Sequence, residues 1–202
     1  GVGLVGSEMC IRDSIYSQRP SRPLHIDTFI PKKVNTTKSV VILVHGGGWK
    51  KGDRSSEHTK AAWFSSRGYV TVCPEYRLSG EATFPAAIHD LKDAIRWTRS
   101  HAAQWGANSN NITLVGFSAG AHLVALAATA GPEAGLDLPD SQKRSSSVAA
   151  CIAVAGPSIT NDEPTFQNAR APSSNYQLFF GGLPETIPEV YERASPAHWV
   201  SG

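Results

Sequence analysis

The fold of this chain is decided by one stretch, Ile112-Thr113-Leu114-Val115-Gly116-Phe117-Ser118-Ala119-Gly120. The stretch joins a β-rich run to an Ala- and Leu-rich helix pattern at Ala119–Thr129, with Gly-x-Ser-x-Gly at the junction. A turn this tight leaves no room for flanking side chains, so Gly116 and Gly120 are the residue types that it tolerates. Ser118 is expected to project above the carboxyl edge of a sheet, at the N-terminus of the following helix. This placement predicts a catalytic nucleophile rather than a chance turn.

A glycine-rich loop lies upstream of this stretch. It reads His45-Gly46-Gly47-Gly48-Trp49 and directly follows the apolar run Val40–Val44. Glycines let a backbone approach a substrate and turn its amides inward, and a tetrahedral intermediate needs N–H donors aimed at its oxyanion. A phosphate-binding loop would instead need Gly-Lys-Ser/Thr at the start of a helix, which Trp49-Lys50-Lys51-Gly52 does not supply. Two motifs in this order are more specific than either alone.

Short β-rich runs alternate with helical patterns around both motifs. Strands are predicted at Leu24–Ile30, Val40–Val44, Tyr69–Cys73, Asn111–Gly116 and Val148–Ala155, the last as a buried strand. Helices are predicted at Ser55–Arg67, from Phe84-Pro85 to Trp105-Gly106, and at Ala119–Thr129. This alternation predicts the α/β class, with a mostly parallel sheet and helices on both faces. Residues 158–202 are rich in Pro, Asn, Ser and Gly and are interpreted as connection and cap structure, with a short helix pattern at Pro188–Ala194.

Composition bounds the function. The chain has 202 residues, 41% hydrophobic and 18% charged, with a net charge of +2, which is typical of one globular enzyme domain. Acidic and basic residues are mixed along the chain, so no basic cluster indicates binding to nucleic acid. No apolar run is long enough to span a bilayer. The cysteines are odd in number and scattered, and no histidines have ligand spacing, so neither a disulfide framework nor a metal or cofactor is expected. Oligomeric state is undetermined, and the compartment stays open between the cytoplasm, taken by default, and secretion.

The N-terminus differs in character from the rest. Gly6–Ser14 resembles translated adapter sequence from the ends of metagenomic reading frames. Residues 1–14 are therefore interpreted as a non-native or disordered segment, and residues 15–202 as the domain.

Two linking motifs, Glu75-Tyr76-Arg77-Leu78 and Phe84-Pro85-Ala86-Ala87, complete a family resemblance. From about Leu24 to Ser201 the chain resembles the α/β-hydrolase fold, in the branch of hormone-sensitive-lipase-like esterases and small carboxylesterases. The resemblance implies hydrolysis of a small-molecule carboxylic ester without a cofactor or metal. It implies that Gly47 and Gly48, with Ala119, supply the oxyanion-hole amides, and that His45, Gly46 and Trp49 support the loop.

The chain also departs from the stricter members of that branch. Glu75 stands where they have Asp, Ser79-Gly80 where they have Ala-Pro, and Phe117 where they have Asp before the serine. It therefore resembles a looser relative, near bacterial acetyl- or feruloyl-type esterases and kynurenine-formamidase-like enzymes. Hydrolysis of an amide or formamide, and ligand binding without turnover, stay open as alternatives.

The acid and the base of the expected triad are not evident. In this fold the chain order is Ser, then Asp or Glu, then His, and nothing after Gly156 reads as the strands that would carry the last two. The chain is therefore expected to be a C-terminally truncated hydrolase, weakly active or inactive. The alternative is an acid at Asp162 or Glu163 with His198 as base. His122 is interpreted as a packing histidine, and Asp90 as the structural partner of Arg77.

Overall fold

A computed structural model describes residues 2–4, 9–138, 144–157, 163–171 and 174–200 of the chain. Its strands form one sheet of seven in the order β1-β2-β3-β5-β4-β6-β7. The strands are β1 (Val2–Leu4), β2 (Met9–Gln18), β3 (Pro23–Pro31), β4 (Val40–Val44), β5 (Val70–Pro74), β6 (Ile112–Phe117) and β7 (Ala150–Val154). The longer helices are α1 (His58–Ser65), α2 (Ala86–His101) and α3 (Ala119–Thr129). The α/β class is confirmed, and strand and helix bounds agree closely with the sequence patterns.

Strand β4 lies inside the sheet, where it pairs in parallel with β5 on one side and β6 on the other. All of its side chains are buried, as its continuous run of Val, Ile and Leu predicts. The register sets Val44 opposite Gly116. The glycine-rich loop after β4 and the serine turn after β6 therefore leave the sheet side by side at one edge.

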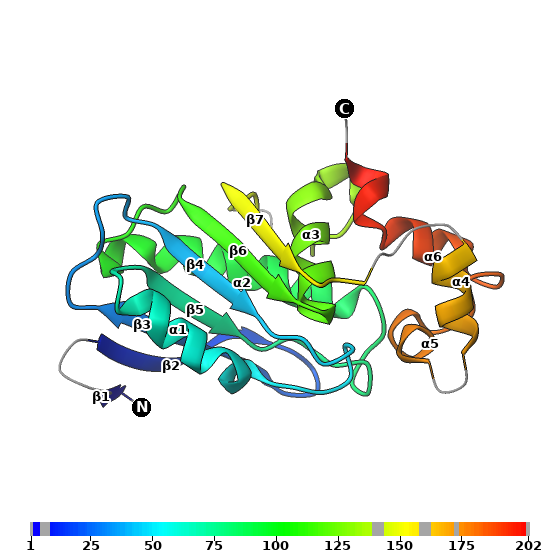
Figure 1. Cartoon of the computed structure of the whole chain (residues 1–202), viewed down its shortest axis with the longest axis horizontal. Coiled ribbons are helices and arrows are strands. Elements are labelled where there is room, and N and C mark those ends of the chain that lie inside the picture. Colours follow the sequence, from blue (N-terminus) through cyan, green and yellow to red (C-terminus); the bar gives the residue numbers. More distant parts are fainter. Residues whose placement is uncertain (1, 5–8, 139–143, 158–162, 172–173, 201–202) are drawn as a thin grey trace.

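Helices cover both faces of the sheet, as the alternation predicted (Figure 1). On one face α1 packs over a cluster that includes Phe29, Val41 and Leu43. On the opposite face α2 and α3 pack over the alternate residues of the same strands, among them Ile42 and Val44. Two apolar layers therefore hold the sheet, and the loops at its carboxyl edge stay free for a site.

Helix α2 has the apolar stripe that the sequence predicts, and its Asp90 forms ion pairs with two arginines. Its apolar stripe is buried against the sheet. Asp90, on the same helix, is fully buried and accepts from Arg77 Nε at 2.8 Å, so the predicted ion pair is confirmed. Arg19 of the β2–β3 connection donates to the same carboxylate at 2.7 Å, a second partner that the sequence did not indicate.

The prediction of a buried strand at residues 148–155 is wrong for most of its side chains. Ile152 is 52% exposed and Val154 is 40% exposed. Over the described residues, β7 pairs with β6 alone and so forms the edge of the sheet. An apolar run predicts burial only where a neighbouring strand and a covering layer are both present, and α1 does not reach this edge (Figure 1).

Next to the other edge strand, β1, strand β2 pairs antiparallel with β3 along its length, from Met9 opposite Pro31 to Gln18 opposite Pro23. The segment interpreted as lying outside the domain thus contributes residues 9–14 to the sheet. Asp13, within it, accepts a hydrogen bond from His25 Nδ1 at 2.9 Å. That these residues are foreign to the natural protein stays a prediction.

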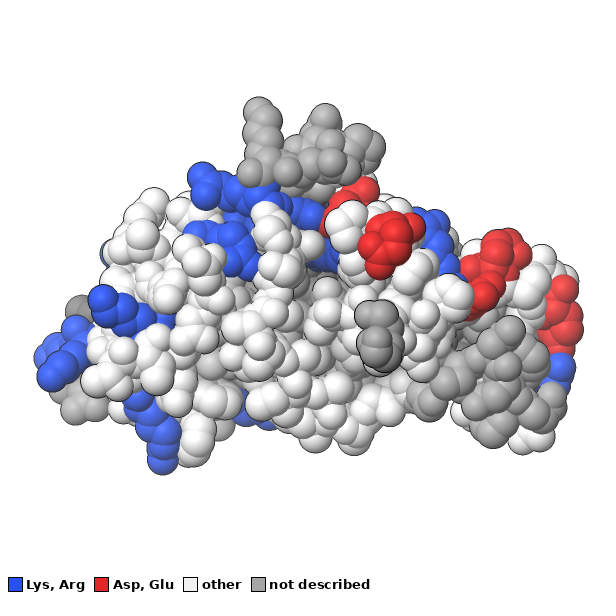
Figure 2. All heavy atoms as spheres, turned by 90° about the horizontal axis from the view of Figure 1, so that it is seen from above, with Lys and Arg blue, Asp and Glu red and all other residues white. Residues whose placement is uncertain are grey.

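The chain after β7 forms short helices, namely α4 (Glu163–Arg170), α5 (Asn175–Phe180), α6 (Pro188–Arg193) and the 3-10 turn η5 (Pro196–Trp199). Helices α4, α5 and α6 lie together beyond the carboxyl ends of β4 and β6, and η5 packs beside α3 (Figure 1). On the face shown in Figure 2, Asp and Glu gather toward this end and Lys and Arg toward the other. None of the described helices has the length and apolar character needed to cross a bilayer.

Candidate active site

Ser118 occupies a strained turn between β6 and α3. Its backbone has φ 52° and ψ −121°, a conformation that costs a non-glycine residue about 1–3 kcal/mol. Its N–H donates to the carbonyl of Val154 at 3.0 Å, which ties the turn to the end of β7. The side chain of Ser118 is exposed. The turn therefore presents a hydroxyl to solvent at the carboxyl edge of the sheet.

Both glycines of Gly-x-Ser-x-Gly are required by close backbone contacts. A Cβ on Gly116 would lie 2.3 Å from the carbonyl oxygen of Gly120. A Cβ on Gly120 would lie 2.3 Å from the carbonyl oxygen of Val44. These overlaps are with backbone that cannot rotate away, so the motif is set by the crossing of α3 over β4 and β6.

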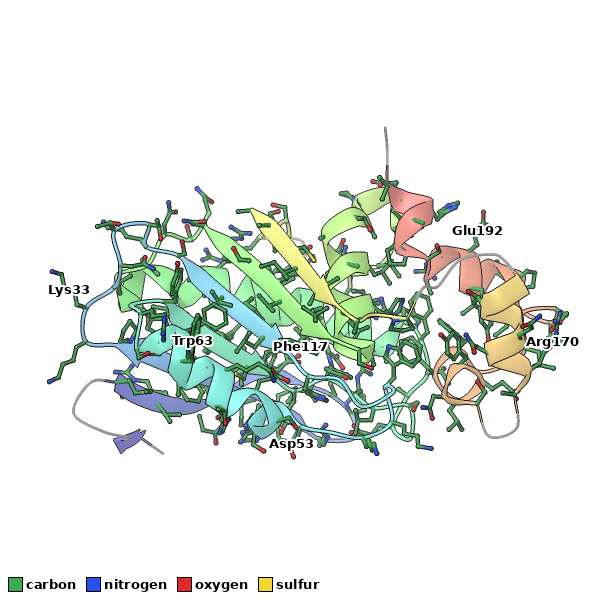
Figure 3. The ribbon with its side chains drawn as sticks, viewed as in Figure 1. Lys33, Asp53, Trp63, Phe117, Arg170 and Glu192 are labelled. Carbon is green, nitrogen blue, oxygen red and sulfur yellow. The ribbon has the colours of Figure 1, made fainter. Side chains whose placement is uncertain are left out.

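Phe117, the residue before the serine in the motif, lies on the α1 side of the sheet. It packs at the edge of the α1-side cluster, and the Lys60 ammonium lies 4.4 Å from its ring centroid. Figure 3 shows Phe117 at the end of β6, whereas Arg170 and Glu192 lie on the outer side of the C-terminal helices. The substitution of Phe for the polar residue found in stricter relatives therefore affects packing on the α1 face.

The glycine-rich loop is pressed against the serine turn. A Cβ on Gly46 would lie 2.8 Å from the carbonyl oxygen of Phe117 and 3.1 Å from Cβ of Ser118. Gly47 and Gly48 have φ values of 119° and 60°, which favour glycine. The loop can approach Ser118 this closely only because it carries no side chains here.

His45 holds the base of this loop. It is buried, its Nδ1 donates to the carbonyl of Gly46 at 2.7 Å, and its ring stacks on Tyr76 at 4.4 Å. The Tyr76 hydroxyl donates to the carbonyl of His45 at 3.0 Å. Burial lowers the pKa of His45, so the ring is held neutral. These contacts fix the backbone from which the loop departs.

Ser118 opens into a cavity of about 280 Å³. The cavity is lined by Gly48, Trp49, Ser118, Ala119, Ala155, Gly156, Pro157, Asn175 and Tyr176. The structure thus brings Ser118 together with Gly48, Ala119 and Trp49 of the predicted site. Gly47 is not among the residues that line the cavity, and a Cβ on it would overlap the carbonyl oxygen of Lys51.

Sequence reasoning missed the far wall of this cavity. Gly156 and Pro157 follow β7, so the rule that parallel strands end at one edge could have indicated them. Asn175 and Tyr176 come from α5, and no local pattern marks them as site residues. They are placed there by Trp49, which stacks on Phe179 of the same helix at 4.7 Å.

No histidine borders this cavity among the residues that the structure describes. His122, on α3, is fully buried, with Nε2 donating to the carbonyl of Ala194 at 2.8 Å, and burial lowers its pKa to about 4. It packs edge-on against Trp49, as a packing histidine would. His198 contacts Glu192 and Trp199 instead. Of the alternative acids, Asp162 lies outside the described residues, as does the side chain of Glu163.

Comparison with known proteins identifies the family. Residues 26–202, which include the serine turn, the glycine-rich loop and the cavity, match the BD-FAE family. The chain belongs to the BD-FAE family. The resemblance to α/β-hydrolase carboxylesterases that the motifs predicted is thereby confirmed.

Relatives of this BD-FAE chain include named esterases. Esterase LipC of Mycobacterium tuberculosis is 29% identical over 194 residues, which are 94% of this chain and 47% of LipC. An arylesterase of Saccharolobus solfataricus is 36% identical over 103 residues, which are 50% of this chain and 33% of that enzyme. The chain therefore spans about half the length of LipC and a smaller part of the arylesterase.

Solved structures support the same fold. Esterase 2 of Thermogutta terrifontis, with propionate bound, has a TM-score of 0.75 at 23% identity, covering 95% of this chain and 67% of that one. A bifunctional GH43-CE protein of Bacteroides eggerthii has a TM-score of 0.79 at 24% identity, covering 95% of this chain and 29% of that one. At these identities the two structures show the fold of the BD-FAE chain.

Proposed function

We propose that this chain carries the nucleophile and the oxyanion hole of a serine carboxylic-ester hydrolase that acts on small acyl esters. One observation carries the proposal: the exposed, strained Ser118 shares a small cavity with the backbone of Gly48 and Ala119. Membership of the BD-FAE family and the esterase names of its relatives support it.

The geometry suits acyl transfer. Ser118 Oγ attacks the ester carbonyl carbon and the C=O electron pair moves to oxygen, where the N–H groups of Gly48 and Ala119 stabilise the charge. The C–O bond to the alcohol then breaks, the alcohol leaves with a proton, and water releases the acid from Ser118 by the same addition and elimination. The predicted contribution of Gly47 to the oxyanion hole remains a proposal.

The proton of the Ser118 hydroxyl needs an acceptor. No histidine among the described residues lines the cavity. With the described groups alone, we expect slow turnover. Loss of the nucleophile's base in a comparable hydrolase lowers kcat on the order of a million-fold. Covalent labelling of Ser118 is therefore a more sensitive readout than turnover.

The size of the cavity favours short acyl groups. A volume of about 280 Å³ bounded by Trp49, Pro157 and Tyr176 holds a short acyl chain. The Thermogutta terrifontis esterase has been solved with propionate and with butyrate bound, acids of this size. Acetyl to butyryl esters are the substrates that we infer.

The test uses the full chain and its Ser118→Ala variant. Both are treated with a fluorophosphonate, and intact mass and peptide mapping locate the adduct. We expect one adduct at Ser118 and none in the variant. Hydrolysis of p-nitrophenyl acetate and butyrate should exceed that of p-nitrophenyl palmitate and should fall to background in Ser118→Ala. Equal labelling or equal turnover in the variant would overturn the assignment, and faster turnover of N-formylkynurenine than of the esters would support a formamidase instead.

A further inference from the structure

The side chain of Asn175 lies against the glycine of the proposed oxyanion hole. A Cβ on Gly48 would lie 2.4 Å from Asn175 Nδ2 and 3.1 Å from its Cγ, so the nitrogen end of the carboxamide is the nearest group. Both residues border the cavity of Ser118 and Ala119. Over the described part of the chain, the carboxamide has no hydrogen-bond partner, although it is half-buried.

This position is held from two sides. The hydroxyl of Ser174 caps α5 by accepting from the N–H of Tyr176 at 3.1 Å, and it donates to the carbonyl of Asn168 at 2.7 Å. At the other end of α5, the carbonyl of Phe179 accepts from the N–H of Phe84 at 2.7 Å. With the stacking of Phe179 on Trp49, these contacts fix α5 against the glycine-rich loop. Asn175 is therefore aimed by packed structure and not by a free loop.

The carboxamide is only half-buried, so water can reach it in the free chain and its N–H groups stay available to a bound substrate. The group that reaches this point during acyl transfer is the carbonyl oxygen, which becomes negative beside Gly48 and Ala119. Donors fixed in advance at that oxygen stabilise the transition state more than the ground state. A carboxamide N–H is such a donor.

We propose that Asn175 Nδ2 donates a hydrogen bond to the substrate carbonyl oxygen as it becomes an oxyanion, beside the backbone donors of Gly48 and Ala119. This rests on the proposed function of Ser118. It makes Asn175 a catalytic residue supplied by the segment after β7, and not by either sequence motif.

The test measures reaction of Ser118 with a neutral p-nitrophenyl phosphonate in the full chain, because the phosphoryl oxygen takes the place of the carbonyl oxygen. The variants are Asn175→Ala, which removes the amide, and Asn175→Asp, which keeps the shape and replaces the donor by a carboxylate. Leu178→Ala is the matched control, since Leu178 lies on the same helix with its side chain 47% exposed and away from the cavity. Intact mass against time and phosphonate concentration gives the maximal rate and the half-saturating concentration.

We expect the maximal rate to fall about 100-fold in both Asn175 variants, the size seen when a single oxyanion donor is removed. The half-saturating concentration and the urea midpoint should stay unchanged, and Leu178→Ala should match the wild type. An unchanged maximal rate, a change in half-saturation alone, or a full rate in Asn175→Asp would overturn the role of Asn175. Adduct formation that persists in Ser118→Ala would instead overturn the proposed function, so the two failures are distinguishable.

Discussion

The indole of Trp49 stacks on the ring of Phe179, with centroids 4.7 Å apart and 15° between the planes. Trp49 ends the glycine-rich loop and Phe179 belongs to α5, and both are almost fully buried. The stack joins the wall of the cavity that comes from the sheet to the wall that comes from the C-terminal segment.

Phe179→Ala should therefore destabilise the protein strongly. Removing a buried aromatic ring leaves a void and lowers the free energy of unfolding by about 3–5 kcal/mol. Urea unfolding followed by tryptophan fluorescence would measure this. Leu178→Ala is the control and should lie within about 0.5 kcal/mol of wild type, because its side chain is exposed. Equal effects of the two substitutions would contradict the anchoring role of the stack.

Gly120→Ala should impair folding, because its new Cβ would lie 2.3 Å from the carbonyl oxygen of Val44. Overpacking against backbone lowers stability by about 1–3 kcal/mol or more. Gly80→Ala is the matched control, since a Cβ there meets nothing within 4 Å. Thermal unfolding of both variants checks the difference, and a Gly120→Ala protein as stable as Gly80→Ala would show that α3 does not cross β4 this closely.

The pH dependence of stability should contain a contribution from His122. Burial lowers its pKa to about 4 from the ordinary value of 6.5, so the unfolded chain binds the proton more tightly than the folded one. The contribution is fully present above about pH 6.5 and is lost as the pH falls toward 4, with a total of about 3 kcal/mol. Urea unfolding at pH 7.5 and pH 5, for wild type and His122→Asn, isolates it. The variant should lose less stability between the two pH values, and identical losses would refute the shift.

Asp90→Asn should be destabilising because Arg19 and Arg77 both donate to this buried carboxylate. Removing one partner of a buried ion pair costs about 3–5 kcal/mol, since it leaves charge uncompensated. The exposed Glu189→Gln removes the same charge at the surface and should change the free energy of unfolding by less than about 0.5 kcal/mol. Chemical unfolding compares them, and a small effect at Asp90 would mean that solvent reaches the pair.

Val154→Lys should reduce self-association. β7 is an edge strand over the described residues and exposes Ile152 and Val154, and an exposed apolar edge invites pairing between chains. Sedimentation velocity across a concentration series would show a smaller associated fraction in the variant. Leu178→Lys adds the same charge at an exposed apolar site off the sheet and should leave association unchanged. An equal reduction by both would point to net charge and not to the edge.

Hydrophobic periodicity along the sequence predicted those elements whose structure depends on residues close together in the chain. The run Val40–Val44 and the stripe of α2 have unambiguous periodicity, and both elements occur where predicted. The same reasoning failed at β7. An apolar run predicts a strand, but whether that strand is buried depends on neighbours from other parts of the chain. The pairing of residues 9–14 with β3 was missed for a similar reason, since strand pairing is not local.

The candidate site divides in the same way. Ser118, Gly48 and Ala119 were predicted because the nucleophile turn and the glycine loop each have a strict steric requirement that restricts residue type. The role of Gly47, predicted with them, stays a prediction: Gly47 does not line the cavity, and the direction of each amide in a loop follows from φ and ψ and not from composition. Asn175 carries no such restriction in its sequence context. Its position depends on how α5 packs, which no short pattern records.

The backbone overlaps at Gly116 and Gly120 leave the nucleophile turn almost no freedom to vary, whereas the opposite side of the cavity is built from a short helix attached mainly by aromatic side chains. The attacking serine and much of the wall that meets the acyl group are thus encoded in separable parts of the chain. A lineage could exchange α5 for another sequence and acquire a new acyl preference while its attacking group stayed in place. Grafting α5 segments that keep an asparagine at position 175 onto this sheet is accordingly a practical route to altered esterases, in which the acyl-binding wall is redesigned and the proposed donor is retained.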